Sequence, residues 1–197
     1  MLDNRVLEGI IRYCSENVYL PSDDTYLLSK VLIEDRDLRD RNVVLEIGSG
    51  SGYLSCIACK HNNYVVAIDL SLEAVECSKR ILDLCECSEK SDVVLCDSAS
   101  CLRERSVEAV FFNPPYLPED SDIRWSGGVR GIERTIEFLK ESYRVVRRGG
   151  VIVFLTSTAG DLAELLKSIV SRGGRPRVVR SVRKFFEILM VLKLMGE

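Results

Sequence analysis

The length, composition and charge of the chain exclude several classes of protein. At 197 residues it is long enough for one well-buried domain and too short for two comfortable ones. Its 46% apolar and 29% charged residues are ordinary for a globular protein, and no apolar run approaches the ~20 residues that cross a bilayer. The N-terminus lacks the basic and apolar regions of a secretory signal. We therefore predict a cytoplasmic protein with no membrane contact.

Strand-like and helix-like segments alternate along the chain. Strands are predicted at residues 43–47, 64–68, 93–96, 107–112 and 150–155, and helices up to residue 60 and over 72–84, 133–146 and 161–171. This alternation predicts an α/β fold, a doubly wound and mostly parallel seven-stranded sheet with helices on both faces. Residues 177–181 and 185–194 complete it as a C-terminal antiparallel hairpin. We predict one domain over 1–197, with a helical segment at 1–40 before a core at 41–197.

Eight cysteines lie mostly within these helix-like and strand-like runs. Cys56 and Cys59 have the spacing of metal ligands, but no second well-spaced pair accompanies them, and His61 is the only histidine. In a reducing compartment a free cysteine behaves as a small buried apolar residue. The sequence therefore predicts free core cysteines and no metal site.

A glycine-rich turn follows the first predicted strand. Gly48, Gly50 and Gly52 are spaced as G-x-G-x-G, and they suit a sharp turn that lets a ligand approach the backbone. The dinucleotide pattern G-x-G-x-x-G would need a glycine where Tyr53 stands, which counts against a nicotinamide or flavin cofactor.

Acidic residues stand at the ends of successive predicted strands. Asp69 ends the second strand and is placed to accept hydrogen bonds from ribose hydroxyls. Asp97, with Ser98 beside it, ends the third strand and could accept from an adenine amino group, and Glu46 precedes the first glycine. Acids suit a sulfonium cofactor that bears an ammonium group, whereas a phosphate ligand would need Lys or Arg. This pattern predicts S-adenosylmethionine as the cofactor.

The fourth predicted strand ends in Asn113-Pro114-Pro115-Tyr116. Two prolines fix an extended backbone and remove two N–H donors, so that carbonyl groups can line the site. The Asn113 side-chain oxygen and the Pro114 carbonyl can each accept one hydrogen from a planar –NH₂ group, on which Tyr116 can stack. Holding the nitrogen in this way would aim it at a reactive methyl group. We predict these four residues as the catalytic site.

In this order, the motifs resemble class I methyltransferases of the HemK family, which methylate the glutamine of the Gly-Gly-Gln motif in peptide-chain release factors. Residues 113–116 match the signature tetrapeptide, and Trp125-Ser126-Gly127-Gly128 with Gly131 resembles the loop after it. Residues 18–28 resemble an N-terminal segment that closes over the cofactor, and 184–193 resemble the closing strand of the archaeal and eukaryotic branch. The resemblance implies cofactor contacts from Thr25, Glu46, Gly48, Asp69, Asp97 and Asn113, to which the glycine pattern adds Gly50 and the third strand end adds Ser98.

About 40 residues precede the glycine strand, too few for the separate helical domain of bacterial members. The chain therefore looks like the short branch, whose eukaryotic members form a heterodimer with a small zinc-binding activator subunit. In the strand order that the resemblance implies, the predicted strand at 93–96 would be an unprotected apolar edge of the sheet. We hypothesise that such a partner covers it.

Two other substrates remain open. The same tetrapeptide serves adenine-amino methyltransferases that act on nucleic acids, and lysine methylation is a third possibility. Residues 144–184 hold ten Lys and Arg against two acidic residues, a block that could attract RNA. The chain as a whole is acidic, with a net charge of −3, and has no room for a target-recognition domain. These features disfavour direct nucleic-acid binding.

Overall fold

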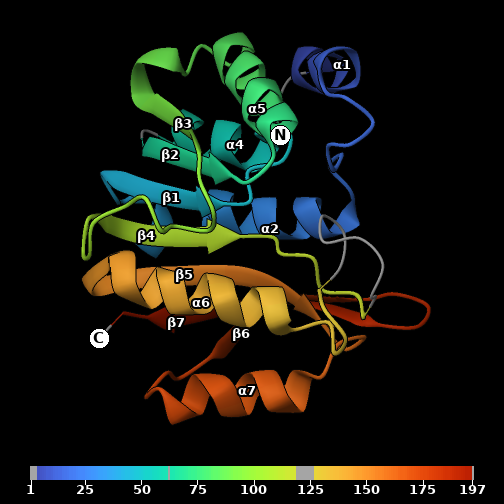
Figure 1. Cartoon of the computed structure of the whole chain (residues 1–197), viewed down its shortest axis with the longest axis vertical. Helices are drawn as coiled ribbons and strands as arrows, with labels where there is room; N and C mark the ends of the chain where they lie inside the picture. Colours follow the sequence, from blue (N-terminus) through green and yellow to red (C-terminus); the bar gives the residue numbers. More distant parts are fainter. Residues whose placement is uncertain (1–3, 62, 119–126, 197) are drawn as a thin grey trace.

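The computed structural model describes residues 4–61, 63–118 and 127–196. Its centre is a seven-stranded sheet in the order β3-β2-β1-β4-β5-β7-β6 (Figure 1). The first five strands in sequence pair in parallel, and β7 runs antiparallel to both of its neighbours, β5 and β6. The predicted mostly parallel sheet with a C-terminal antiparallel hairpin is confirmed. The strands are β1 (Val43–Ile47), β2 (Tyr64–Asp69), β3 (Ser91–Leu95), β4 (Val107–Phe112), β5 (Val146–Ser157), β6 (Arg177–Arg183) and β7 (Ile188–Met195).

Helices cover both faces of the sheet. Successive residues of a strand point to opposite faces, so Val44 and Phe111 enter one apolar core while Leu45 and Phe112 enter the other. The first core contains α1 (Asn4–Tyr13), α2 (Asp23–Glu34), α4 (Tyr53–Lys60) and α5 (Leu72–Leu84), and the second contains α6 (Glu133–Val145) and α7 (Leu162–Ser171). No helix in the described ranges is both long and apolar enough to span a bilayer.

The described residues from 4 to 40 contain α1, α2 and the short α3 (Arg36–Arg39). Helix α1 packs against α5, and α2 packs against α4 and the β5–β7 part of the sheet. A capping box begins α2, because the Ser22 side chain accepts from the Thr25 backbone while the Thr25 hydroxyl accepts from the Ser22 N–H at 3.3 Å. This cap fixes the point at which the chain enters the helix, beside the ends of the central strands.

The bounds of β2, β3, β5, β6 and β7 differ from those predicted. Strand β3 lies at residues 91–95, and β5 begins at Val146 instead of residue 150. The extra β5 residues include Gly149 at φ +70° and pair with β4 across a register shift between Val107 and Ala109. Strand β7 begins at Ile188, so Phe185 and Phe186 belong to the turn between β6 and β7 and are fully exposed.

The prediction of free cysteines is wrong, because the structure pairs all eight in disulfides. The pairs are Cys14–Cys77, Cys56–Cys85, Cys59–Cys87 and Cys96–Cys101. Three pairs join residues 28 to 63 positions apart, and they fasten α5 and the turn after it to α4 and to the end of α1. Their Cα–Cα distances of 5.0–6.2 Å lie within the range that a disulfide spans. Such pairings depend on how the helices pack, which the spacing along the chain does not reveal.

Candidate active site

The carboxyl ends of the parallel strands meet at one edge of the sheet, where a cavity of about 610 Å³ opens. We call it the strand-end cavity. In an open α/β sheet this edge is where ligands bind. All of the site residues predicted from the sequence line this cavity: Thr25, Glu46, Gly48, Gly50, Asp69, Asp97, Ser98, Asn113, Pro114, Pro115 and Tyr116. The structure thus brings together residues spread over 92 positions of the chain, although their individual roles stay predictions.

The glycine turn between β1 and α4 has the left-handed backbone that its sequence predicts. Gly48, Gly50 and Gly52 have φ of +74°, +51° and +75°, a region that other residues rarely adopt. A side chain at Gly52 would also approach the Ser78 backbone of α5 to 2.8 Å. The turn is closed by Asp69, whose carboxylate accepts from the Gly50 N–H at 2.9 Å. The first strand end, the turn and the second strand end therefore form one rigid wall of the cavity.

One partly buried and one fully buried carboxyl group lie in this wall. Asp69 accepts hydrogen bonds from the backbone N–H groups of Gly50 and Ser71 at 2.9 and 3.0 Å, which fix its position, while burial raises its pKa. Glu46 is 2% exposed and accepts from the Ser55 hydroxyl, and burial raises the pKa of Glu46 to about 8. A positive ligand group beside Glu46 would favour its charged form. The wall is therefore suited to a cationic ligand.

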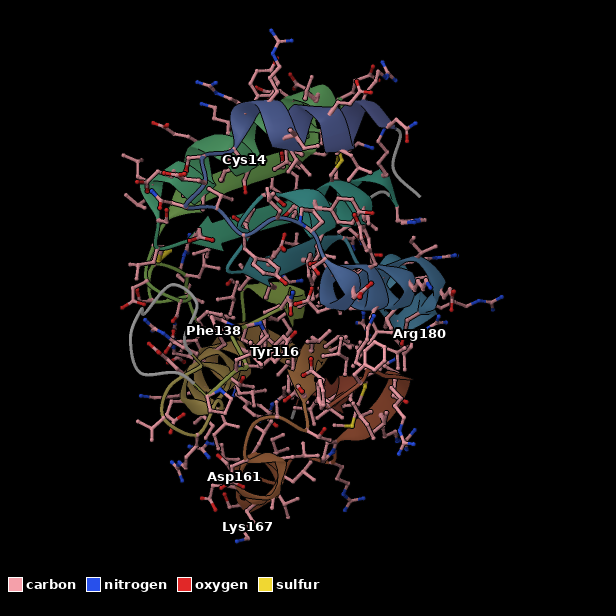
Figure 2. The ribbon with its side chains drawn as sticks, turned by 90° about the vertical axis from the view of Figure 1, so that its right-hand side faces the viewer. Cys14, Tyr116, Phe138, Asp161, Lys167 and Arg180 are labelled. Carbon is pink, nitrogen blue, oxygen red and sulfur yellow. A yellow bond between two sulfur atoms is a disulfide. The ribbon has the colours of Figure 1, made fainter. Side chains whose placement is uncertain are left out.

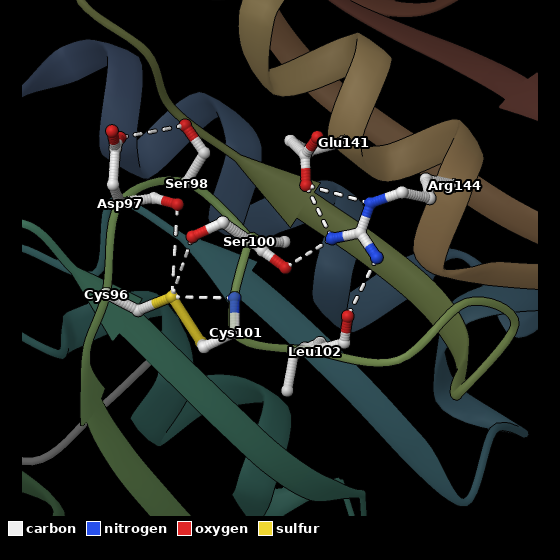
Figure 3. Close-up of a disulfide and its surroundings, with 9 residues drawn as sticks. Cys96, Asp97, Ser98, Ser100, Cys101, Leu102, Glu141 and Arg144 are labelled. Carbon is white, nitrogen blue, oxygen red and sulfur yellow. Dashed lines mark hydrogen bonds and ion pairs between the residues drawn. A yellow bond between two sulfur atoms is a disulfide. The ribbon is translucent and has the colours of Figure 1, made fainter.

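The loop after β3 presents Asp97 and Ser98 to the cavity (Figure 3). Ser98 is held at φ +51°, and its hydroxyl lies 3.4 Å from the Asp97 carboxylate. Arg144 of α6 braces the far side of the loop, donating to the carbonyls of Ala99 and Leu102 at 2.6 and 2.8 Å while it pairs with Glu141. The Cys96–Cys101 disulfide closes the same loop (Figure 3). Asp97 is itself exposed, so its carboxylate is available to a ligand in the cavity.

The Asn113-Pro114-Pro115-Tyr116 corner follows β4 and faces the glycine turn across the cavity. The Asn113 side-chain NH₂ donates to the Thr25 hydroxyl of α2 at 3.5 Å. Its other end, the oxygen Oδ1, is buried and has no hydrogen-bond partner among the described residues. A buried acceptor without a donor is costly, so this oxygen is suited to accept a hydrogen bond from a group outside the described protein. Thr25, predicted as a cofactor contact, therefore lies where it also orients Asn113.

Asp24 is a site residue that the sequence analysis missed. It is 3% exposed and accepts hydrogen bonds from the Tyr19 hydroxyl at 2.8 Å and the Tyr116 hydroxyl at 3.3 Å. Its other oxygen accepts from the Thr25 N–H at 2.5 Å. Burial and the Asp24 charge raise the pKa of both tyrosines, so their hydroxyls remain donors. Asp24 thereby fixes the Tyr116 ring relative to α2. Because Asp24 stands beside Thr25 in the first turn of a helix, the sequence alone does not indicate that it belongs to the site.

Helix α6 supplies two further lining residues, Arg134 and Phe138, which were also missed. They are four positions apart and so lie on one face of the helix. Arg134 pairs with Glu137 at 2.7 Å, and the Phe138 ring lies 3.5 Å from the place that a side chain at Gly48 would occupy. Figure 2 labels Phe138 and Tyr116, which both face this region. The helix pattern alone does not tell which face of α6 meets the strand ends.

The glycines after the corner pack against its backbone. A side chain at Gly127 would come within 2.9 Å of the Pro115 carbonyl oxygen, and one at Gly131 within 2.6 Å of the Tyr116 carbonyl oxygen. Gly131 also has φ +71°. These glycines therefore let the chain return closely over the corner and hold it in place. Trp125 and Ser126, predicted as part of the same loop, lie outside the described residues.

The donors and acceptors of the cavity fit S-adenosylmethionine. Carboxylates of Glu46, Asp69 and Asp97 are spaced along the wall, and among the described lining residues Arg134 is the one Lys or Arg, already paired with an acid. This arrangement disfavours a phosphate-bearing ligand and suits hydroxyls and positive charge. The buried Asn113 oxygen, which has no partner among the described residues, is a further acceptor in a residue that lines the same cavity.

Comparison with known proteins also indicates a methyltransferase. The family model described as Methyltransferase small domain matches residues 23–186. A protein of Methanocaldococcus jannaschii with the provisional name protein N5-glutamine methyltransferase MJ0928 is 30% identical over 94% of this chain and 95% of its own length. The structure is similar to that of the E. cuniculi Mtq2–Trm112 complex, responsible for methylating the translation termination factor eRF1, with a TM-score of 0.74, 26% identity and coverage of 92% and 99% of the two chains. It also shares its fold with a Thermotoga maritima SAM-dependent O-methyltransferase, at a TM-score of 0.67, 13% identity and coverage of 97% and 71%.

Proposed function

We propose a substrate for this chain, which belongs to the methyltransferase small domain family. It methylates the side-chain amide nitrogen of the glutamine in the Gly-Gly-Gln motif of a peptide-chain release factor. The chain is a HemK-like, S-adenosylmethionine-dependent methyltransferase of class I fold. Our proposal adds that its substrate is a glutamine side chain of a protein. The names of its M. jannaschii relative and of its E. cuniculi structural neighbour support this substrate.

One observation supports this substrate most directly: the buried Oδ1 of Asn113 that lacks a donor. The Thr25 hydroxyl accepts from the amide's NH₂ end, which leaves this oxygen as the unused acceptor of a residue that lines the cavity. An amide –NH₂ would donate one hydrogen to Asn113 and the other to the Pro114 carbonyl, while the Tyr116 ring covers its flat face. A flexible lysine ammonium would gain less from a site built for a planar group.

The cofactor supplies an electrophilic methyl group on a positively charged sulfur. Asp69 and Asp97 would hold its ribose and adenine, and Glu46 would lie beside its positive charge. The 113–116 corner then contributes position: it presents the nitrogen in line with the methyl group, and its carbonyl dipoles favour the charge that develops on nitrogen. Catalysis would come mainly from this positioning.

The test is to incubate the chain and labelled cofactor with a release factor, its Gln→Ala variant, and nucleic acid. We expect label on the release factor alone, recovered after proteolytic digestion as N5-methylglutamine, and none on the Gln→Ala variant. Label on nucleic acid but not on the release factor would favour the adenine alternative, and label recovered as methyllysine would favour the third. Either result would contradict the proposal.

A small activator subunit that pairs with the chain is a second part of the proposal. The structural neighbour from E. cuniculi is a complex with Trm112. Here β3 lies at one end of the sheet order, and Leu95 on this edge strand is 54% exposed. An open apolar edge strand is a ready site for another chain. That the partner binds zinc is part of the same proposal.

We expect a Trm112-type subunit to co-purify with the chain and Leu95→Lys to weaken the pairing at least tenfold, because the lysine ammonium would be desolvated at the contact. The matched control is Ile11→Lys, at an apolar position on α1 that is 76% exposed. Size-exclusion chromatography and calorimetry measure the effect. A chain that is a stable monomer with full activity on its own would refute the requirement for a partner.

A cytoplasmic location also belongs to the proposal. Disulfides are rare in cytosolic proteins, but intracellular proteins of hyperthermophiles are rich in them. Four disulfides and a cytoplasmic location are therefore compatible in an organism of that kind. Alkylation of the cysteines in freshly lysed cells, followed by mass spectrometry, would show whether the pairs exist there.

A further inference from the structure

The turn between β6 and β7 exposes two consecutive aromatic side chains. Phe185 and Phe186 are 99% and 101% exposed. Single exposed apolar residues are common on protein surfaces, but two adjacent phenylalanines with no burial form a concentrated apolar patch. In Figure 1 this hairpin projects at the same side of the molecule as the carboxyl ends of the parallel strands. The patch therefore lies on the side at which the strand-end cavity opens.

The two phenylalanines line a second hollow of about 430 Å³, which we call the hairpin hollow. It shares Asp24, Tyr116 and Leu117 with the strand-end cavity, so the two adjoin at the catalytic corner. Leu117, which is 47% exposed, adds further apolar surface, whereas Leu189 lies buried beneath the hollow at 2% exposure. A polypeptide whose target side chain enters the strand-end cavity beside Tyr116 would therefore place its neighbouring residues over this hollow.

The hairpin tip is anchored to the rest of the molecule. Lys184 forms an ion pair with Asp23 of α2, and Glu187 accepts a hydrogen bond from the Ser157 hydroxyl at the end of β5. The Ile188 N–H donates to the Thr158 hydroxyl at 2.9 Å. These contacts hold the tip beside the catalytic corner, so the two phenylalanines are presented in a fixed place and binding need not order the turn.

The charges around the hairpin hollow favour a polypeptide over a nucleic acid as its ligand. Its described lining contains the carboxylates of Asp23, Asp24 and Glu187, and one cation, Lys184, which is already paired with Asp23. Carboxylates would repel the phosphates of a nucleic acid, whose binding is driven by free Lys and Arg. Several cations of the 144–184 block are also paired, such as Arg147 with Glu108 and Arg180 with Glu34 (Figure 2 labels Arg180). The hollow suits an uncharged or basic polypeptide with apolar side chains.

We propose that the hairpin hollow docks the polypeptide around the methylated glutamine, with Phe185 and Phe186 packed against apolar side chains of the substrate protein. This proposal rests on the proposed function, because it takes the substrate to be a protein. Buried aromatic anchors dominate binding at protein interfaces, so two of them beside the catalytic corner would set much of the affinity for substrate. They would contribute nothing to cofactor binding, because neither lines the strand-end cavity.

The test compares the parent chain with a Phe185→Ser and Phe186→Ser double variant, using purified release factor as the substrate. We expect KM for the release factor to rise at least about tenfold, with kcat within about threefold and cofactor affinity unchanged. The matched control is Ile11→Ser with Val170→Ser, two apolar positions on α1 and α7 that are 76% and 61% exposed and lie outside the hollow. Because all four side chains are exposed, we expect both double variants to fold.

A second arm does not depend on methyl transfer. A photoreactive benzoylphenylalanine placed at Phe186 should cross-link to the release factor, and the same group at Val170 should not. If the parent chain methylates the release factor but the Phe185→Ser and Phe186→Ser variant behaves like the control, the docking proposal is wrong. If the parent transfers no methyl group yet the cross-link at position 186 forms, the proposed reaction fails and docking stands. A cross-link to an RNA oligonucleotide instead of the protein would overturn the docking proposal.

Discussion

Asn113→Ala should lower kcat by about 10²–10³-fold while changing the affinity for S-adenosylmethionine by less than about threefold, by analogy with the loss of one preorganised hydrogen-bonding group at a reacting centre. The Asn113 side-chain NH₂ donates to the Thr25 hydroxyl. Its buried Oδ1 has no hydrogen-bond donor among the described residues and is therefore free to accept from the substrate. Removing this oxygen leaves the substrate nitrogen free to rotate out of line with the methyl group. Single-turnover kinetics and calorimetry measure the two quantities separately.

Asp69→Ala is the matched comparison, because it should affect the cofactor instead. The Asp69 carboxylate is fixed by two backbone N–H groups in the wall of the strand-end cavity. Its loss should weaken cofactor binding by about 10- to 100-fold, as expected when hydrogen bonds to a charged group are removed. Equal cofactor affinities for Asp69→Ala and the parent would contradict the ribose assignment. An Asn113→Ala variant that keeps its kcat would contradict the catalytic assignment.

The central sheet was predictable because its strands leave a strong mark on the sequence. A strand covered on both faces is apolar along its whole length, and β1 and β4 have the predicted bounds of 43–47 and 107–112. The strand ends were predictable for a related reason, since the carboxyl ends of parallel strands meet at one edge. Acids placed directly after two such runs, at Asp69 and Asp97, had to lie near each other.

What could not be predicted depends on packing between distant segments. Asp24 and Tyr19 line the cavity because the start of α2 lies beside the strand ends, and Phe138 does so because one face of α6 turns to Gly48. The sequence predicts that Phe185 and Phe186 belong to a strand, because apolar, aromatic residues usually favour strands. The hydrogen bond from the Lys184 N–H to the Glu187 carbonyl, at 2.8 Å, makes it a turn instead.

The disulfides are the clearest example of this dependence, and they lead to the largest expected effect on stability. The Cys14–Cys77 bond closes a loop between residues 63 positions apart, and closing such a loop in the unfolded chain stabilises the fold by about 4 kcal/mol. Cys14→Ala with Cys77→Ala should therefore lower Tm by roughly 8–16 °C in a domain of this size. The control is Cys96→Ala with Cys101→Ala, which opens a loop between residues only five positions apart and should cost about 2 kcal/mol.

Calorimetry with and without reductant separates the bond from the side chains. Reductant should lower the Tm of the parent by at least as much as the Cys14→Ala and Cys77→Ala variant loses, because it opens all four bonds. Alkylation under denaturing conditions should leave all eight cysteines of the unreduced parent unmodified by mass. Eight alkylated cysteines and a Tm that reductant does not change would show that the fold brings these thiols together without joining them. In that case α5 would be held to α1 and α4 by apolar packing alone.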